Sequence, residues 1–108
     1  MRRLRSVDEA REALSQAVVI VFKHSTRCGV SAAAYAQVRS FLDSHPDVPV
    51  CLVDVIEDRE ISAEITRASS VRHESPQVLL LKGGRVVWHA SHYGITAEAV
   101  ARECLKAD

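Results

Sequence analysis

Hydrophobic residues recur along the chain with two different periods, and each period predicts a kind of element. Apolar residues that return every three or four positions predict helices, whereas short β-branched or apolar runs predict strands. The predicted elements are, in order, a helix over 6–17, a strand over 18–22, a helix from 30 to about 45, a strand over 50–55, a helix from Asp58, strands over 77–81 and 85–89, and a helix after Thr96. The predicted order is therefore α-β-α-β-α-β-β-α.

Several residues mark where these elements begin and end. Ser6 and Glu9 have the spacing of a capping box, in which two side chains satisfy free N–H groups at a helix start. Pro46 ends the second helix because proline has no N–H. Gly83-Gly84 separates the last two strands, and glycine tolerates the positive φ angles that a tight hairpin turn needs. The last two strands should therefore form an antiparallel pair.

The element order also predicts how the strands are arranged. The first β-α-β unit should give two parallel strands, because such crossovers are right-handed and return the chain in the same direction. The terminal β-β-α unit adds an antiparallel pair. We expect one domain over residues 1–108 with the thioredoxin fold, a four-stranded mixed sheet flanked by helices. The basic cluster Arg2, Arg3 and Arg5 precedes the first helix and is interpreted as a solvated tail.

The composition of the chain argues against some classes of protein function. Fourteen basic residues balance fourteen acidic ones, so no net positive charge favours nucleic acid. The longest apolar run, Ala17 to Phe22, is too short to span a membrane. The start MRRLRS continues into polar sequence rather than a hydrophobic signal, and the three cysteines favour a reducing compartment. We therefore expect a cytoplasmic protein that binds neither nucleic acid nor membrane.

Cys28 is the residue for which sequence and layout both indicate reactivity. It lies in the polar loop 24–29, just before the second helix, where free N–H groups and the helix dipole favour a thiolate. The thiolate is the attacking form of cysteine. Lys23, His24 and Arg27 lie close in sequence and could add positive potential. The alternative is a small core cysteine, the commoner state for a lone Cys.

Position 31 determines which mechanism is available. A dithiol oxidoreductase would have a second cysteine there, but the chain reads Cys28-Gly29-Val30-Ser31. Serine cannot resolve a disulfide. A mixed disulfide on Cys28 therefore persists until a thiol from another molecule attacks it. Ser31 either donates a hydrogen bond to the Cys28 thiolate or is a simple helix-start serine. Ser75-Pro76 precedes a strand, and its backbone could pair with a substrate as a short added strand.

Five segments of the chain resemble the YtxJ-type bacilliredoxins. These segments are Phe22–Thr26, Cys28–Ser31, Ser75–Gln77, Lys82–Gly84 and His92–Thr96. The Phe-Lys-His-Ser-Thr stretch is fairly specific, and the resemblance covers nearly the whole chain. It implies a redox enzyme that removes bacillithiol, a low-molecular-weight thiol, from cysteines of S-thiolated client proteins. Bacillithiol would then be a co-substrate with no bound cofactor, and a second small thiol or a disulfide reductase would restore the enzyme.

Gly29 departs from that family, which usually has proline at this position, and suggests a second resemblance. Cys28–Ser31 is similar to the Cys-Gly-Phe-Ser signature of monothiol glutaredoxins, which hold a [2Fe–2S] cluster with glutathione, although Val30 replaces the phenylalanine. A third possibility is a thioredoxin-fold adaptor without catalysis. Cys51 and Cys104 fall at core positions of a strand and a helix. The five histidines have no ligand spacing with the cysteines, so we expect no metal site.

Overall fold

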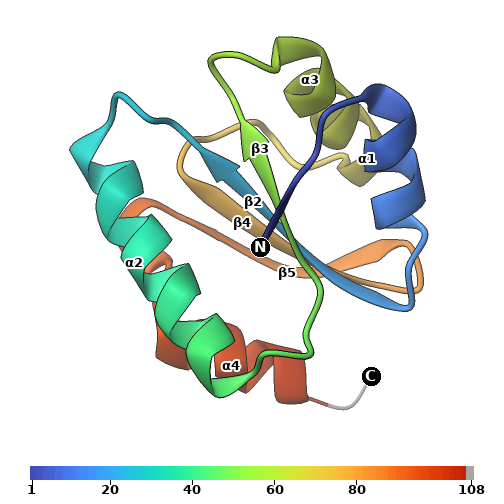
Figure 1. Cartoon of the computed structure of the whole chain (residues 1–108). Coiled ribbons are helices and arrows are strands. Elements are labelled where there is room, and N and C mark those ends of the chain that lie inside the picture. Colours follow the sequence, from blue (N-terminus) through green and yellow to red (C-terminus); the bar gives the residue numbers. More distant parts are fainter. Residues whose placement is uncertain (107–108) are drawn as a thin grey trace.

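The computed structural model describes residues 1–106 as a mixed sheet covered by helices on both faces (Figure 1). The elements are β1 (Arg2–Arg3), α1 (Val7–Leu14), β2 (Val18–His24), α2 (Gly29–Ser44), β3 (Val50–Asp54), α3 (Arg59–Ser69), β4 (Gln77–Lys82), β5 (Arg85–Ser91), the 3-10 turn η1 (His92–Gly94) and α4 (Ala97–Leu105). The strand order is β1-β3-β2-β4-β5. β3 is parallel to β1 and β2, whereas β4 is antiparallel to β2 and β5. The predicted α/β layout is therefore confirmed.

The sheet has five strands within residues 1–106, so the prediction of four is wrong by one. The extra strand is β1, whose arginines were expected in a solvated tail. Arg2 pairs with Cys51 and Arg3 with Leu52, and the next residue, Leu4, is completely buried. Its N–H donates to the Leu52 carbonyl over 2.9 Å. A two-residue strand is too short to show a period of two, which explains why the pattern missed it.

The core is divided into two layers by the sheet. Val19 and Val21 of β2 pack on the side of α1 and α3, whereas Ile20 and Phe22 pack on the side of α2 and α4. All four side chains are fully buried, as alternation along a strand with two covered faces requires. No helix within residues 1–106 is both long and apolar enough to cross a membrane. β2 thus lies in the centre of the sheet and leads directly to the predicted reactive loop.

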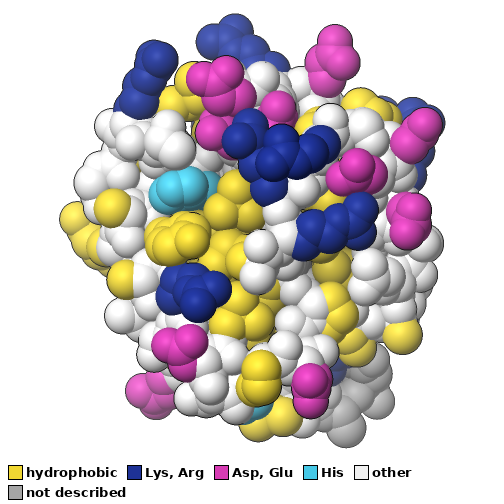
Figure 2. All heavy atoms as spheres, in the orientation of Figure 1, with side chains coloured by type: hydrophobic (Ala, Val, Ile, Leu, Met, Phe, Trp, Pro, Cys, Tyr) yellow, Lys and Arg dark blue, Asp and Glu magenta, His cyan; other side chains and the backbone are white. Residues whose placement is uncertain are grey.

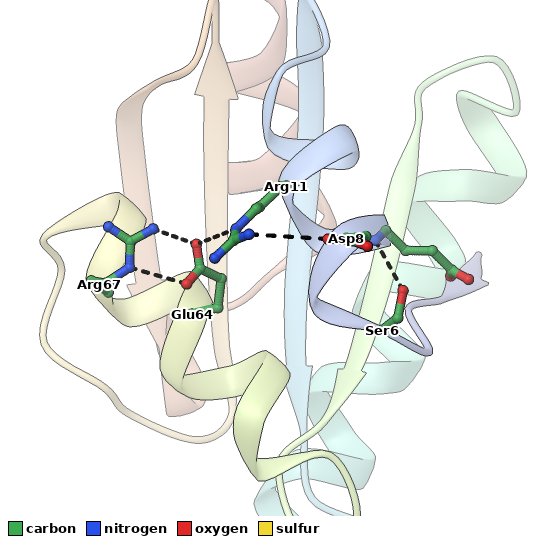
Figure 3. Close-up of polar contacts among 6 residues, drawn as sticks. Ser6, Asp8, Arg11, Glu64 and Arg67 are labelled. Carbon is green, nitrogen blue, oxygen red and sulfur yellow. Dashed lines mark hydrogen bonds and ion pairs between the residues drawn. The ribbon is translucent and has the colours of Figure 1, made fainter.

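Polar contacts join α1 to α3 on the outer side of the first layer (Figure 3). Glu64 of α3 is 8% exposed and accepts hydrogen bonds from Arg67 and from Arg11 of α1. These guanidiniums lower the pKa of Glu64 to about 2, with the Arg67 hydrogen bond the main cause. At the start of α1, Ser6 Oγ accepts the Glu9 N–H over 3.1 Å, so the predicted cap is confirmed.

The predicted element boundaries hold to within two residues, except that the first helix ends at Leu14 and not at residue 17. Gly83 and Gly84 have φ angles of +61° and +80°, which confirms the glycine hairpin turn. Thr96 caps α4 by accepting the Ala99 N–H over 3.1 Å. Asp58 occupies the N-cap position of α3 as predicted, but its side chain makes no capping hydrogen bond. Its carboxylate binds Arg3 instead, which ties the first strand to α3.

Candidate active site

Cys28 is placed by the turn that connects β2 to α2. The turn is closed by the Cys28 N–H, which donates to the Ser25 carbonyl over 3.3 Å. Cys28 is the N-cap residue of α2, with an extended backbone at φ −122° and ψ 123°. No side chain caps this helix, and its first turn contains no acidic residue. The free N–H groups at this end therefore remain available to stabilise negative charge on the Cys28 sulfur.

A shallow pocket of about 260 Å³ lies beside the Cys28 thiol. It is lined by His24, Ser25, Thr26, Cys28, Ala32 and Tyr35. The rings of His24 and Tyr35 lie with centroids 5.3 Å apart, and Phe22 lies 5.3 Å from His24 beneath them. Cys28 itself is half-buried and lines this pocket together with the rings of His24 and Tyr35. The pocket can therefore receive a small group attached to a disulfide.

Ser31 joins the end of β2 to the start of α2. Its side chain is fully buried, and its hydroxyl accepts the Ser25 N–H over 2.9 Å. The same oxygen lies 2.7 Å from His24 Nδ1. Burial lowers the pKa of His24, which favours the neutral ring, and the tautomer of that ring determines whether Ser31 Oγ donates to Nδ1 or accepts from it. A direct hydrogen bond from Ser31 to Cys28 stays a prediction.

Of the basic residues near Cys28 in sequence, His24 lines the same pocket and Lys23 does not. Lys23 is fully buried on the other face of the sheet, where its Nζ lies 2.8 Å from Thr66 Oγ1 and 3.2 Å from His73 Nδ1. The expectation that Lys23 adds positive potential beside Cys28 is therefore wrong. Successive residues of a strand point to opposite faces, so Lys23 and His24 could not both face α2. Arg27 is exposed in the turn before Cys28, where its N–H donates to Ser25 Oγ over 3.4 Å.

The segment before β4 reaches the same end of the sheet. β2 and β4 are antiparallel with Lys23 opposite Gln77, so Pro76 lies opposite His24, where the Cys28 turn begins. The Ser75–Pro76 peptide bond is cis, and Pro76 is buried. The hydroxyl of Ser75 is buried without a partner among residues 1–106, and the same holds for the side-chain oxygen of Gln77. The structure thus brings Ser75 and Pro76 to the end of the sheet that carries Cys28.

The other two cysteines lie in the core layers, as expected, and all three are free thiols. Cys51 in β3 is 3% exposed, and Cys104 of α4 packs partly buried against the second layer. Burial raises the pKa of both thiols, so they are poor nucleophiles. Among residues 1–106, no three His, Cys, Asp or Glu side chains gather closely enough to hold a metal ion. Cys28 is thus the thiol whose surroundings favour reaction.

Comparison with known proteins assigns the chain to a family. The family model described as "Monothiol bacilliredoxin BrxC" matches residues 1–100. The chain belongs to the monothiol bacilliredoxin family. Members of this family are redox proteins, which agrees with an accessible cysteine at the start of a helix. The resemblance seen in the Phe22–Thr26 and Cys28–Ser31 segments is therefore confirmed.

Solved structures similar to this bacilliredoxin share its fold. One, described as a candidate oxidoreductase with a thioredoxin fold, is 32% identical with a TM-score of 0.87, and the match covers 94% of this chain and 91% of that chain. Mitochondrial thioredoxin 3 from Saccharomyces cerevisiae is 19% identical with a TM-score of 0.75, covering 96% and 92%. Thioredoxin from Trypanosoma brucei brucei is 15% identical with a TM-score of 0.77, covering 94% and 84%. The two thioredoxins establish the fold alone.

Proposed function

We propose that this bacilliredoxin is a monothiol oxidoreductase that removes bacillithiol from mixed disulfides on client proteins, with Cys28 as the nucleophile. The observation that carries the proposal is the pairing of two positions at the start of α2. Cys28 stands partly exposed at the uncapped start of the helix, whereas Ser31, three residues later, has a buried hydroxyl bonded to His24 and Ser25. Cys28 supplies the nucleophile. Ser31 has no thiol that could displace the bacillithiol group from Cys28.

The reaction is one thiol–disulfide exchange. The Cys28 thiolate attacks the sulfur of the bacillithiol half of the mixed disulfide, and a new S–S bond forms between them. The bond between bacillithiol and the client breaks, and the client sulfur leaves with the electron pair and takes up a proton. Disulfide bonds are exchanged one for one, so no external oxidant or reductant is consumed in this step. The client is released as a free thiol.

Three features of the site support the attack. The free N–H groups of the first turn of α2 stabilise the thiolate before it reacts. The pocket beside Cys28 offers room for the bacillithiol group next to the His24 and Tyr35 rings. The backbone N–H and C=O of Ser75 have no partner among residues 1–106, so they can pair with an extended client segment. Together these features hold the client disulfide near the sulfur that attacks it.

Recycling must come from outside the domain. Position 31 holds serine, Cys51 is almost fully buried within the sheet, and burial raises the pKa of the Cys104 thiol, so none of the three is suited to resolve the disulfide on Cys28. A second small thiol or a disulfide reductase attacks the mixed disulfide and restores the Cys28 thiol. The modified enzyme is therefore a lasting intermediate that can be isolated when no such thiol is added.

Intact-mass spectrometry tests this proposal directly. Reduced protein is mixed briefly with a client carrying one bacillithiol, and the mass of each partner is measured. We expect one bacillithiol mass on the wild type and on Cys104→Ala, and none on Cys28→Ala. Cys104→Ala is the matched control because Cys104 is the other partly exposed thiol. Release of the client thiol by Cys28→Ala at the wild-type rate, or no transfer to an accessible Cys28, would refute the proposal.

A further inference from the structure

A second pocket lies on the opposite side of the sheet from α2. Its volume is about 530 Å³, within the range of sites that bind small molecules. It is lined by Val55, Arg59, Ser62, Ala63, Thr66, Arg67 and His73, most of which belong to α3. None of these residues lines the pocket at Cys28. Figure 2 shows that charged side chains gather over α1 and α3, whereas hydrophobic ones run between α2 and the strands.

A buried ammonium group lies beneath this pocket. Lys23 Nζ is held by two residues of the pocket lining, at 2.8 Å from Thr66 Oγ1 and 3.2 Å from His73 Nδ1. Within residues 1–106, no carboxylate pairs with this fully buried side chain. Burying a cation without a counter-ion is costly, and here burial lowers the pKa of Lys23 from 10.5 to about 8. At neutral pH the pocket therefore lies above an unbalanced positive charge.

Lys23 also determines which nitrogen of His73 carries a proton. An ammonium group can only donate hydrogen bonds, so His73 Nδ1 must accept from Lys23. Burial and the Lys23 charge lower the pKa of His73, which keeps the ring neutral with its proton on Nε2. His73 thus lines the pocket with an N–H donor whose tautomer is fixed. His73 lines the α3 pocket and does not line the Cys28 pocket.

Two arginines complete the donor set. Arg59, in the first turn of α3, forms no ion pair among residues 1–106, whereas Arg67 also binds Glu64. A guanidinium group matches the two oxygens of a carboxylate. Val55 and Ala63 provide an apolar part of the lining, suited to a short aliphatic chain. The lining therefore favours a ligand that joins a small apolar body to a carboxylate.

We propose that this pocket is a second ligand site, which binds a small carboxylate through Arg59, Arg67 and the Nε2–H of His73. The ligand is either a free dicarboxylate or a carboxylate carried by a low-molecular-weight thiol. Binding at this pocket does not require Cys28. The proposed ligand site can therefore be tested independently of the proposed thiol exchange.

Nuclear magnetic resonance of the ¹⁵N-labelled Cys28→Ala protein tests this site without interference from disulfide chemistry. The protein is titrated with sodium succinate, with reduced bacillithiol, and with succinamide, the neutral analogue of succinate, at matched ionic strength. We expect saturable shifts of the amides of residues 59–67 and 73 with at least one of the two anions. Arg59→Gln should weaken that binding about tenfold, as the loss of one charge-assisted hydrogen bond does. Arg39→Gln on α2 is the matched exposed control and should leave it unchanged.

The outcomes of the titration distinguish a free carboxylate from one carried by a thiol, and some of them would contradict the proposal. If bacillithiol shifts these amides at lower concentration than succinate, the ligand is the carboxylate of the thiol. If succinate is the tighter ligand, it is a free carboxylate. Equal shifts with succinamide, no shifts with either anion, or shifts confined to residues 24–35 would overturn the proposal. Equal affinities of Arg59→Gln and Arg39→Gln would overturn it as well.

Discussion

Replacing Gly29 with proline should stabilise this bacilliredoxin. Gly29 is the first residue of α2, and proline is favoured at that position because its fixed φ is already helical. The preceding residue, Cys28, has φ −122° and ψ 123°, which are angles that a residue before proline adopts readily. A Cβ added at Gly29 would meet no atom within 4 Å. The folded protein therefore has open space where proline adds its Cβ.

The size of the effect follows from the unfolded chain. Glycine samples more backbone conformations than any other residue, so replacing it with proline removes conformational entropy from the unfolded state only. The lost N–H is one of the free donors at the helix start, so no helical hydrogen bond is broken. We expect the free energy of unfolding to rise by about 1 kcal/mol. For a domain of this size that corresponds to roughly 4 °C in Tm.

Urea unfolding of Gly29→Pro, monitored by fluorescence of the single tryptophan, Trp88, measures this change. The urea concentration at the midpoint of unfolding should rise. The slope of the unfolding free energy against urea concentration should stay constant, because the surface exposed on unfolding is the same. Gly29→Ala is the matched control, since alanine keeps the N–H and adds only the Cβ. A lower midpoint for Gly29→Pro beside an unchanged one for Gly29→Ala would refute the reasoning, because it would mean that the N–H is needed in the folded state.

Three further predictions concern buried groups. Ser31→Ala removes the partner of the Ser25 N–H and of His24, so it should cost about 1–3 kcal/mol in urea unfolding; an unchanged midpoint would mean that water replaces the hydroxyl. Leu4→Ala should cost about 2–5 kcal/mol in the same assay, and a near-neutral result would contradict the burial of β1 against the sheet. Lys23→Met tests the lowered pKa of Lys23. Between pH 8 and 10.5 the folded wild type releases this proton before the unfolded chain does, so wild-type stability should rise relative to Lys23→Met, and a constant difference would contradict the argument.

Helices and strands that are defined by the hydrophobic pattern and by capping residues could be predicted from the sequence. Ser6 and Thr96 cap their helices, and Gly83-Gly84 turns the hairpin, because each of these local structures depends on nearby residues alone. The position of Cys28 at the start of α2 followed in the same way. β1 could not be predicted, because its two arginines become a strand only through pairing with β3, a contact far away in sequence.

The surroundings of the candidate site depended on which face of the sheet each side chain occupies. Lys23 and His24 are neighbours in sequence, and the polar residues around them suggested one basic cluster. Their places at the end of β2 send them to opposite faces, toward α3 and α2 respectively. Extending the predicted strand by two residues would have separated them. The partners of Lys23, Thr66 and His73, lie more than forty residues away along the chain and left no signal near it.

The central position of β2 has a consequence for how the molecule opens. β2 is hydrogen-bonded to β3 on one side and to β4 on the other, whereas β1 and β5 are edge strands. Amide hydrogens at such a centre exchange with solvent only when the whole domain unfolds, while edges exchange through local fraying. Cys28 lies four residues beyond the end of this central strand. Partial opening at either edge therefore leaves the sulfur in place, and the reactive end of the domain is among the last parts to lose its structure.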